Sequence, residues 1–452
     1  MIREYEHVEI VVKKLIDEQR QDIAFPLLDF YFDKCTTIID FDFIGRLSLK
    51  YTHSELAVKC AERSHSLAFV PEELYIARSN LYKAYHSANE PEKALFYAGL
   101  NLEKTPDDFE TKLSYAEYLK SNGQRLKSEK IVDELASRDD LDEKQKETLW
   151  TSDAHRTLRS GQTALGIKKY LHTDKDKTTV FDLRGMKRWN GVLIPGSKIY
   201  INAEGGIGDA IVNIRFFNHL RSYGMEPILF SNLDRFDLDS VFRRNGYNVI
   251  TRECAIQKDT PWEYMMQLPV TLGVTEKDLW NGFYLKAKKD PKNDLGPKTK
   301  FRIGIKCNGN QFFARDAYRS IPIHEILSAL PNNVEVYYID TEREHHQVIN
   351  LKNKIKSWDD TLDFISQMDL IMSSCTSVVH ASGAMGIPTI VYTPILEYYT
   401  WTSSRIDNST PWYGDNFHVY KQMKPKSWLE PIESSRKFIN KIVNEYYKME
   451  KS

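Results

Sequence analysis

The sequence predicts a helical N-terminal domain of repeated units, followed by a parallel α/β module of two Rossmann-like halves. Apolar residues recur at helical spacing up to about residue 172, with few strand signals among them. Beyond that point short apolar runs alternate with amphipathic stretches, which is the pattern of βα units. A chain of 452 residues also exceeds what a single core usually holds, so two or three domains are expected.

A weak internal repeat with a period of 34 positions lies between residues 76 and 138. A helix, a short turn, a second helix and then a proline, here Pro106 opening the next helix, are typical of tetratricopeptide-type hairpins. A generic helical bundle is the alternative, because one repeat pair can arise by chance. The recurring positions are Leu81, Tyr85, Asn89 and Ala94, which are matched by Tyr115, Leu119, Gly123 and Ser128.

Changes in composition predict the domain boundaries. The helical domain is expected to span 1–172, with degenerate repeat units at 54–64 and 147–171 and a polar linker at 172–177. A charged, Pro/Gly-containing seam at 286–300 divides the α/β module. The predicted parts after the linker are an N-terminal half at 178–290, a C-terminal half at 300–425 and a helix at 428–448.

Strand candidates fall in both halves of the α/β module. Two facing halves of this type place a ligand in the crevice at the carboxyl ends of their strands. The candidates are residues 198–203, 226–231, 248–252, 302–306, 334–339, 370–373 and 389–392.

The composition argues against several classes of protein. Lys and Arg together number 62 and Asp and Glu 63, so no global charge bias favours nucleic acid or a membrane surface. The five cysteines are scattered without a CxxC pair, so neither a zinc site nor a disulfide framework is expected. The sequence shows no signal-peptide pattern and no bilayer-spanning run, which favours the cytoplasm of a bacterium or of a phage-infected host.

The stretch NAEGGIGDA, residues 202–210, predicts a strand end, a glycine-rich turn and a helix start. Such a turn can bind a phosphate, but Asp209 in the first helical turn would repel one, and the dinucleotide-binding fingerprint is incomplete. Asp209 is therefore either an ordinary first-turn acid or a carboxylate that deprotonates an acceptor hydroxyl in the crevice. The pair Asp237 and Asp239 has the spacing of a metal-binding DxD motif, but we expect it to be solvated.

Two further segments could bind a phosphate. A buried strand at 370–372 runs into small hydroxyl residues and a helix at 378–385, whose N-terminal N–H groups could face an anion. His380 on this helix faces either the ligand or the core, and the core is the commoner place for a lone histidine. In GIKCNGNQFFARDAYRSIP, Arg315 and Arg319 follow a strand and are either diphosphate ligands or solvated surface residues.

Taken in order, these segments resemble glycosyltransferase family nine, the heptosyltransferase-like family, in a form linked to tetratricopeptide repeats. The resemblance covers about residues 200–422 and implies a GT-B fold of two Rossmann-like halves. The segments that carry it are AEGGIGDAIVNIRFFNHLRSYG, MMQLPVTLGV with FYL, GIKCNGN with RSIP, DTLDFISQMDLIMSSCTSVVHASGAMGIPTIVYTP, and WTSSRIDNSTPWYGDNFHVYKQ.

The resemblance implies a role for each matching residue. Asp209 would be the catalytic base, and the N-terminal half would face the acceptor. Two departures matter, since Cys375 stands where the family usually has Asp, and Cys307 where it often has Trp. The implied acceptor-side residues are Glu204, Gly205, Gly206 and Gly208, and the implied donor-binding residues are Asn308, Asn310, Arg319, Cys375, Thr376, Ser377 and His380.

The function implied is an inverting, metal-independent glycosyltransferase. It would use a nucleotide-diphosphate sugar as co-substrate, no other cofactor, and an acceptor hydroxyl on a protein, a glycan or a modified DNA base. One alternative is a phage-type transferase acting on a hydroxymethylated DNA base. Another is a non-catalytic scaffold in which the helical repeats hold a protein partner and the second module is a vestigial nucleotide-sugar reader.

Overall fold

The computed structural model forms two compact units. The predicted linker at 172–177 and Arg315 lie outside the residues that it describes. The first unit comprises Met1–Lys146, Asn310–Tyr318 and Met423–Ser427, and the second comprises Glu147–Gly309, Arg319–Gln422 and Trp428–Ser452. The described residues are 2–171, 183, 185–231, 237–251, 254, 256–310, 313, 316–341 and 343–449.

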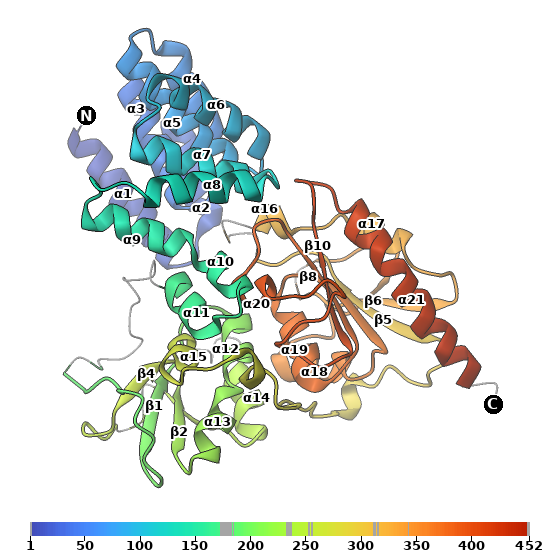
Figure 1. The fold of residues 1–452 in the computed structure, drawn as a ribbon. Coiled ribbons are helices and arrows are strands. Elements are labelled where there is room, and N and C mark those ends of the chain that lie inside the picture. The colour runs from blue at the N-terminus through green and yellow to red at the C-terminus, as the bar shows by residue number, and fades with distance from the viewer. Residues whose placement is uncertain are drawn as a thin grey trace. The chain divides into compact units, whose positions relative to one another are not determined.

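The first unit is built from helices in which each packs on the next along the chain (Figure 1). Ala57, Ala61, Ala94 and Ala98 bring neighbouring helices close together around larger residues such as Leu81. The helices are α1 (Ile2–Asp17), α2 (Gln21–Phe32), α3 (Ile38–Lys50), α4 (Ser54–Leu67), α5 (Pro71–Ser87), α6 (Pro91–Lys104), α7 (Phe109–Ser121) and α8 (Arg125–Ala136), and α9 (Glu143–Ser152) crosses into the second unit.

The helical repeat predicted from the 34-residue period is confirmed. Asn89 ends one hairpin turn at φ 55° and Gly123 ends the next at φ 75°, so equivalent positions have the same left-handed backbone. Ala94 on α6 and Ser128 on α8 are both buried. Pro106 does not open the following helix as predicted, because it lies in the turn before Asp108, which caps α7 by accepting from Thr111 N at 2.8 Å.

The second unit contains two sheets in which every strand pairing is parallel. The first sheet has the order β3-β2-β1-β4 and the second the order β10-β9-β8-β5-β6-β7. All seven predicted strands are present, with ends shifted by one or two residues where the structure describes them. The strands are β1 (Lys198–Asn202), β2 (Glu226–Phe230), β3 (Asn248–Ile250), β4 (Trp262–Tyr264), β5 (Phe301–Lys306), β6 (Val334–Tyr338), β7 (Ile349–Asn350), β8 (Leu370–Ser374), β9 (Thr389–Thr393) and β10 (Phe417–Lys421).

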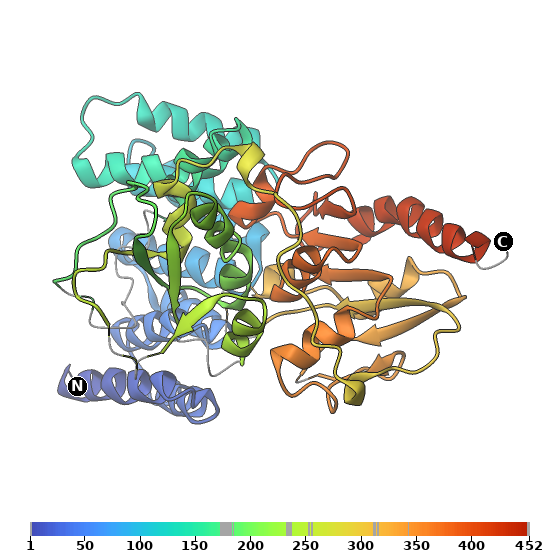
Figure 2. The ribbon, with the colours of Figure 1, turned by 90° about the horizontal axis from the view of Figure 1, so that it is seen from below.

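Helices cover both faces of the second sheet. The C-terminal helix α21 (Leu429–Met449) packs Ile432, Ile439 and Val443 against the face that carries Ile303 and Ile305 (Figure 2, α21 in red). The other face shares one apolar cluster with the first sheet and with α11. The remaining helices are α10 (Ala154–Arg159), α11 (Thr163–Leu171), α12 (Ile207–Asn213), α13 (Phe216–Ser222), α14 (Leu238–Arg244), α15 (Leu268–Thr271), α16 (Asp316–Arg319), α17 (Ile323–Ser328), α18 (Trp358–Ile365), α19 (Ser377–Met385) and α20 (Tyr399–Thr402), with 3₁₀ turns η2 (Met265–Gln267), η3 (Glu276–Asp278) and η4 (Pro291–Asn293).

The expectation that Asp237 and Asp239 are solvated is wrong for Asp239. Asp237 is exposed, but Asp239 is fully buried on α14, where it accepts a hydrogen bond from the Ser231 hydroxyl. Within the described residues, no group of three His, Cys, Asp or Glu side chains is placed to hold a metal ion. None of the described helices combines the length and the apolar character that a membrane crossing requires.

Arg215, only 2% exposed, joins the two halves of the second unit. From the end of α12 it donates to the carbonyl oxygens of Val212 (2.7 Å) and Leu279 (2.6 Å), and to that of Trp412 in the C-terminal half. Its Nη2 also donates to the Tyr284 hydroxyl at 3.0 Å. A buried guanidinium needs its donors occupied, so these bonds fix the chain around it.

Four aromatic rings surround the same guanidinium. The Tyr413 ring lies 4.7 Å away, and those of Tyr284, Trp412 and Trp280 at 5.0, 5.5 and 5.9 Å. A cation over desolvated aromatic faces is attracted by about 2 kcal/mol at such sites. The two halves therefore meet at a positive charge held by carbonyl oxygens and π-faces.

Replacing this charge should destabilise the second unit selectively. We expect Arg215→Met to lower its free energy of unfolding by about 3 kcal/mol or more, because each hydrogen bond from a charged donor contributes about 1.5–3 kcal/mol. All 8 tryptophans of the chain lie in this unit, so tryptophan fluorescence in urea reports its unfolding. Arg221→Met is the control, because Arg221 donates to Gly246 O at the surface, and it should cost less than about 1 kcal/mol. Equal urea midpoints for the two variants would contradict the role of Arg215.

The left-handed turn of the repeat gives a second test, in the first unit. Gly123→Ala should cost about 1 kcal/mol because an L-residue is strained at φ 75°. Gly99→Ala within α6 should be neutral or stabilising, since its Cβ would lie an ordinary 3.6 Å from Tyr115 Cε2. Urea unfolding followed by far-UV circular dichroism compares the two, and a Gly99→Ala variant that loses more stability would refute the assignment of the turn.

Candidate active site

Asp209 is held in the first turn of α12 by the glycine-rich turn after β1. Gly206 is the N-cap residue of this helix, and its N–H donates to Asp209 Oδ2 at 2.7 Å. An acid at this position also interacts favourably with the positive end of the helix dipole. One oxygen of Asp209 therefore caps α12, which is the ordinary first-turn role that was one of the two alternatives in the sequence.

The turn fits closely around this carboxylate. Gly205 has φ +80°, and a Cβ built there would lie 2.6 Å from Asp209 Oδ2. Glycine is required at this position on both counts, because the backbone is left-handed and the space is filled. A Cβ on Gly206 would instead lie 3.5 Å from the same oxygen, which is ordinary contact.

The second oxygen of Asp209 faces the C-terminal half. Oδ1 accepts a hydrogen bond from the hydroxyl of Tyr398, which lies in the loop after β9 and is the N-cap residue of α20. Burial first, and then the charge of Asp209, raises the pKa of Tyr398 well above its usual range. Tyr398 therefore keeps its proton and donates it in this bond.

The N-termini of α12 and α19 pack directly against each other. A Cβ on Gly208 would lie 3.2 Å from His380 Cδ2 and 3.6 Å from Ser377 Cα, so glycine permits this approach. The two helices follow β1 and β8, one strand from each sheet. Their first turns thus bring the glycine-rich motif and the hydroxyl-rich motif together, although these lie far apart in the sequence.

The N-terminus of α19 has no side-chain cap in the described structure. Thr376 is its N-cap residue, but Thr376 Oγ1 shares a 3.1 Å hydrogen bond with Ser373 Oγ instead of accepting from the helix. Ser377, the first helical residue, is partly exposed. The first N–H groups of the helix are thus left for other acceptors.

Arg319 and Cys375 lie beside this helix end. Arg319 Nη1 donates to the backbone oxygen of Cys375 at 2.8 Å, and Trp401 Nε1 donates to the Cys375 sulfur at 2.8 Å. Burial raises the pKa of the Cys375 thiol, so the side chain is neutral. Because Arg319 binds the backbone at position 375, this contact does not depend on the acid usual in the resembled family.

His380 is a core residue. It is 4% exposed, its Nδ1 lies 2.7 Å from the Tyr413 hydroxyl, and its ring stacks on Trp401 at 5.0 Å. Burial, aided by the charge of Arg215, lowers the pKa of His380 to about 3, which keeps it neutral. These contacts favour the core position over the ligand-facing one.

Glu204 holds the backbone of the first sheet. Its two carboxylate oxygens accept from the N–H groups of Met265 (2.9 Å) and Met266 (3.0 Å) at the start of η2. A carboxylate with both oxygens bonded to backbone is fixed in place. Glu204 therefore ties the start of η2 to the turn that follows β1.

Three buried side-chain oxygens at the carboxyl end of the second sheet have no hydrogen-bond partner within the described chain. They are Asn308 Oδ1 after β5, Ser374 Oγ at the end of β8 and Thr393 Oγ1 at the end of β9. Buried polar atoms nearly always have a partner, so such a group at one sheet edge indicates a place for polar ligands or water. Asn310, by contrast, belongs to the first compact unit and is described with that unit.

Sequence patterns do not predict the roles of Tyr398 and Arg215 or the ion pair between Lys306 and Asp340. Lys306 Nζ lies 2.7 Å from Asp340 Oδ2 at the carboxyl ends of β5 and β6, and both side chains are largely buried. Lys306 ends a strand in which Phe301, Ile303 and Ile305 are apolar, and a charged residue at such a strand end is a signal that could have identified this pair. No local signal marks Tyr398 within its aromatic-rich segment.

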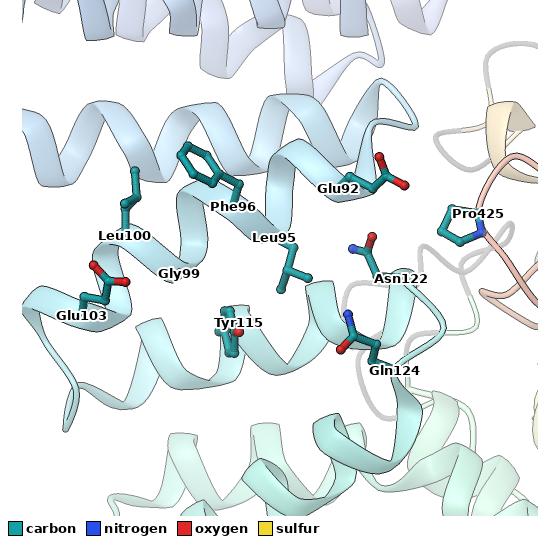
Figure 3. Close-up of a pocket in the computed structure, with 10 residues that line it drawn as sticks. All are labelled: Glu92, Leu95, Phe96, Gly99, Leu100, Glu103, Tyr115, Asn122, Gln124 and Pro425. Atoms are coloured by element: carbon teal, nitrogen blue, oxygen red, sulfur yellow. The ribbon is translucent and has the colours of Figure 1, made fainter.

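The helical repeats carry an open groove (Figure 3). Its volume is about 570 Å³, and its apolar residues on α6 are flanked by two glutamates. Asn122 at its edge already donates to the backbone oxygens of Pro91 and Tyr118, both at 2.7 Å. The lining residues are Glu92, Leu95, Phe96, Gly99, Leu100, Glu103, Tyr115, Asn122, Gln124 and Pro425.

Comparison with known proteins finds similarity at the level of solved structures. No protein-family model and no curated protein matches the chain. A glycosyl transferase family 9 protein from Veillonella parvula is similar at 11% identity and a TM-score of 0.38, over 57% of this chain and 100% of that chain. A mutant O-GlcNAc transferase from Thermobaculum terrenum is similar at 10% identity and a TM-score of 0.36, over 98% of this chain and 93% of that chain.

A third similar structure is the iron-containing dodecameric glycosyltransferase TibC from enterotoxigenic Escherichia coli. It matches at 10% identity and a TM-score of 0.34, over 58% of this chain and 77% of that chain. At these identities and TM-scores, the similarities assign no residue role and no activity to this chain.

The glycine-rich turn provides a matched pair of substitutions. Gly205→Ala should lower the stability of the second unit by at least about 1 kcal/mol, because it combines a left-handed φ with a contact of 2.6 Å to Asp209. Gly206→Ala, with φ −98° and an ordinary contact, should be tolerated within about 0.5 kcal/mol. Tryptophan fluorescence in urea measures both, and equal losses would show that the turn does not enclose the carboxylate as described.

Proposed function

We propose that the second unit is an inverting, metal-independent glycosyltransferase that moves a sugar from a nucleotide-diphosphate donor to an acceptor hydroxyl. The observation that carries the proposal is the meeting of two helix N-termini. One bears the carboxylate of Asp209, and the other has N–H groups that no described side chain caps. A base and an anion site are the two elements that this reaction requires.

The donor would bind on the C-terminal half. The diphosphate would accept hydrogen bonds from the first N–H groups of α19, at Thr376 and Ser377, with the guanidinium of Arg319 beside them. Helix dipole and guanidinium together stabilise the charge that grows on a leaving diphosphate, a task for which other sites use a metal ion. The buried oxygens of Asn308, Ser374 and Thr393 support a polar ligand at the same sheet edge.

The acceptor would approach from the N-terminal half. Asp209 takes the proton of the acceptor hydroxyl while its oxygen attacks the anomeric carbon, and the bond from that carbon to the diphosphate oxygen breaks. Nucleophile and leaving group then lie on opposite sides of the anomeric carbon, which gives inversion. Donation from Gly206 N–H and Tyr398 favours the charged form of the carboxylate that this step needs.

The neutral Cys375 thiol is compatible with this scheme. A second carboxylate at position 375 would add a negative charge close to Asp209, whose charge already acts on the Cys375 side chain. The thiol removes that repulsion and keeps the contact from Trp401. The departure from the resembled family thus changes the charge near the donor without disrupting the backbone that Arg319 contacts.

The role of Asp209 gives the decisive variant. Asp209→Asn should lower kcat by about 10²–10⁴-fold, the contribution of a general base, while leaving donor binding within a few-fold. Release of nucleoside diphosphate from ADP-, GDP-, UDP- and dTDP-sugars, and of CMP from CMP-sugars, measures turnover, and thermal shift measures binding. A variant with full transfer activity would overturn the assignment.

Asp278→Asn is the matched control for this experiment. Asp278 occupies the same capping position in η3, where Oδ2 accepts from Thr275 N at 2.7 Å, but it is outside the candidate site. Its variant should lose a cap of the same kind and keep wild-type turnover. If wild-type protein responds to no member of the panel, the scaffold alternative is favoured instead.

A further inference from the structure

We infer that Tyr398 is a positioning residue for the reaction: its hydroxyl, supplied by the donor-side half, aims the Asp209 carboxylate and keeps it ionised. This inference rests on the proposed function for the role of Asp209. It goes beyond that function because it assigns a cross-half hydrogen bond to the control of the base.

Two donors fix the carboxylate, one on each oxygen. Gly206 N–H donates to Oδ2 at 2.7 Å from within the helix turn, and the Tyr398 hydroxyl donates to Oδ1 from the loop after β9. A carboxylate oxygen has two lone pairs, and the bond from Tyr398 uses one of those on Oδ1. Because the two bonds reach different oxygens, together they restrain the rotation of the carboxylate group.

Packing holds the Tyr398 ring in place. The ring lies against that of Tyr399 at 4.6 Å and edge-on to that of Tyr170 from α11 at 5.7 Å. The Tyr398 backbone oxygen accepts from Thr402 Oγ1 at 3.4 Å within the short helix α20. A tyrosine fixed at ring and backbone places its hydroxyl reproducibly, which is what a positioning residue must do.

Four side chains near Asp209 keep the same charge over a wide pH range. The hydrogen bond from Tyr398 therefore acts on the ionisation of Asp209 and not on theirs. The pKa of Tyr398, Tyr399 and Cys375 is raised by burial, and that of His380 is lowered to about 3. These four side chains therefore stay uncharged between pH 4 and pH 8. The charge of Asp209 acts on Tyr398, Tyr399 and Cys375, and the groups that act on the same three side chains include Tyr170, Arg215 and Arg319.

The first experiment needs no substrate. Urea unfolding of wild type, Tyr398→Phe, Asp209→Asn and the double variant, followed by tryptophan fluorescence at pH 8, forms a double-mutant cycle. A hydrogen bond to a charged group predicts a coupling of tenfold or more in the unfolding equilibrium at pH 8. The bond favours the ionised carboxylate, so its stabilisation is present at high pH and is lost as the carboxylate takes up a proton.

Tyr399→Phe is the control in this cycle. The Tyr399 hydroxyl accepts from Asn213 Nδ2 at 3.3 Å, so its loss removes a neighbouring bond of similar burial that does not involve the carboxylate. Tyr399→Phe should therefore couple to Asp209→Asn far more weakly than Tyr398→Phe does. No coupling between Tyr398 and Asp209 at pH 8 would overturn the inference.

The second experiment uses the nucleotide sugar whose turnover the panel detects. Tyr398→Phe should lower kcat at least tenfold, leave the KM for donor within twofold, and move the acidic limb of the pH–rate profile to higher pH. If Asp209→Asn stays active, the proposed function fails whatever Tyr398 does. If Asp209→Asn is inactive and the Tyr398→Phe profile superimposes on that of wild type, the inference alone fails.

Discussion

The buried guanidinium of Arg215 is the constraint on which the second unit depends. Its charge cannot be left unsolvated, so the carbonyl oxygens of Leu279 and Trp412 must lie where the guanidinium can reach them. Leu279 and Trp412 lie in two chain segments that are not paired with each other as strands of a sheet. Because Arg215 directly follows the helix that carries Asp209, the bonds that satisfy its charge also set the place of the carboxylate relative to the C-terminal half.

The same charge shapes the chemistry of its neighbours. It reinforces burial in keeping His380 neutral, so the helix with the open N-terminus carries no charged side chain of its own next to Gly208. An anion near Ser377 would then be bound by helix N–H groups and Arg319, without a titrating histidine. Asp209, meanwhile, has the first-turn role that was one of the two sequence alternatives, because one oxygen caps α12, and its other oxygen accepts from Tyr398 of the C-terminal half.

Sequence patterns predicted the strands in which neighbouring residues share one environment, such as a buried apolar core. β1 and β8 each contain three consecutive apolar residues next to small or polar ones, and both were found within one or two residues of their ends. β4 was missed because Glu263 at its centre reads as a surface residue, although Arg188 and Thr271 hold its carboxylate within the sheet. β7 has only two residues, too few for any periodic signal.

Residues of the candidate site could be predicted only where the contacts that hold them lie within a few positions in the sequence. Three glycines and an acid in one turn mark Asp209, since the turn geometry and the cap arise within a few residues. Tyr398 lies 189 positions away, and only the packing of the two halves brings its hydroxyl to that carboxylate.

The chain segments that form the first unit determine where the protein can be cut into fragments. Two segments from the C-terminal half of the chain belong to it: Tyr318 donates to His86 O at 2.7 Å, Asn89 donates to Ala317 O at 2.9 Å, and Lys426 pairs with Glu90 at 2.7 Å. The helical repeats are therefore not a detachable module at the start of the chain. A fragment that ends after α8 would lack Tyr318 and Lys426, which bond to His86 and Glu90 within the first unit.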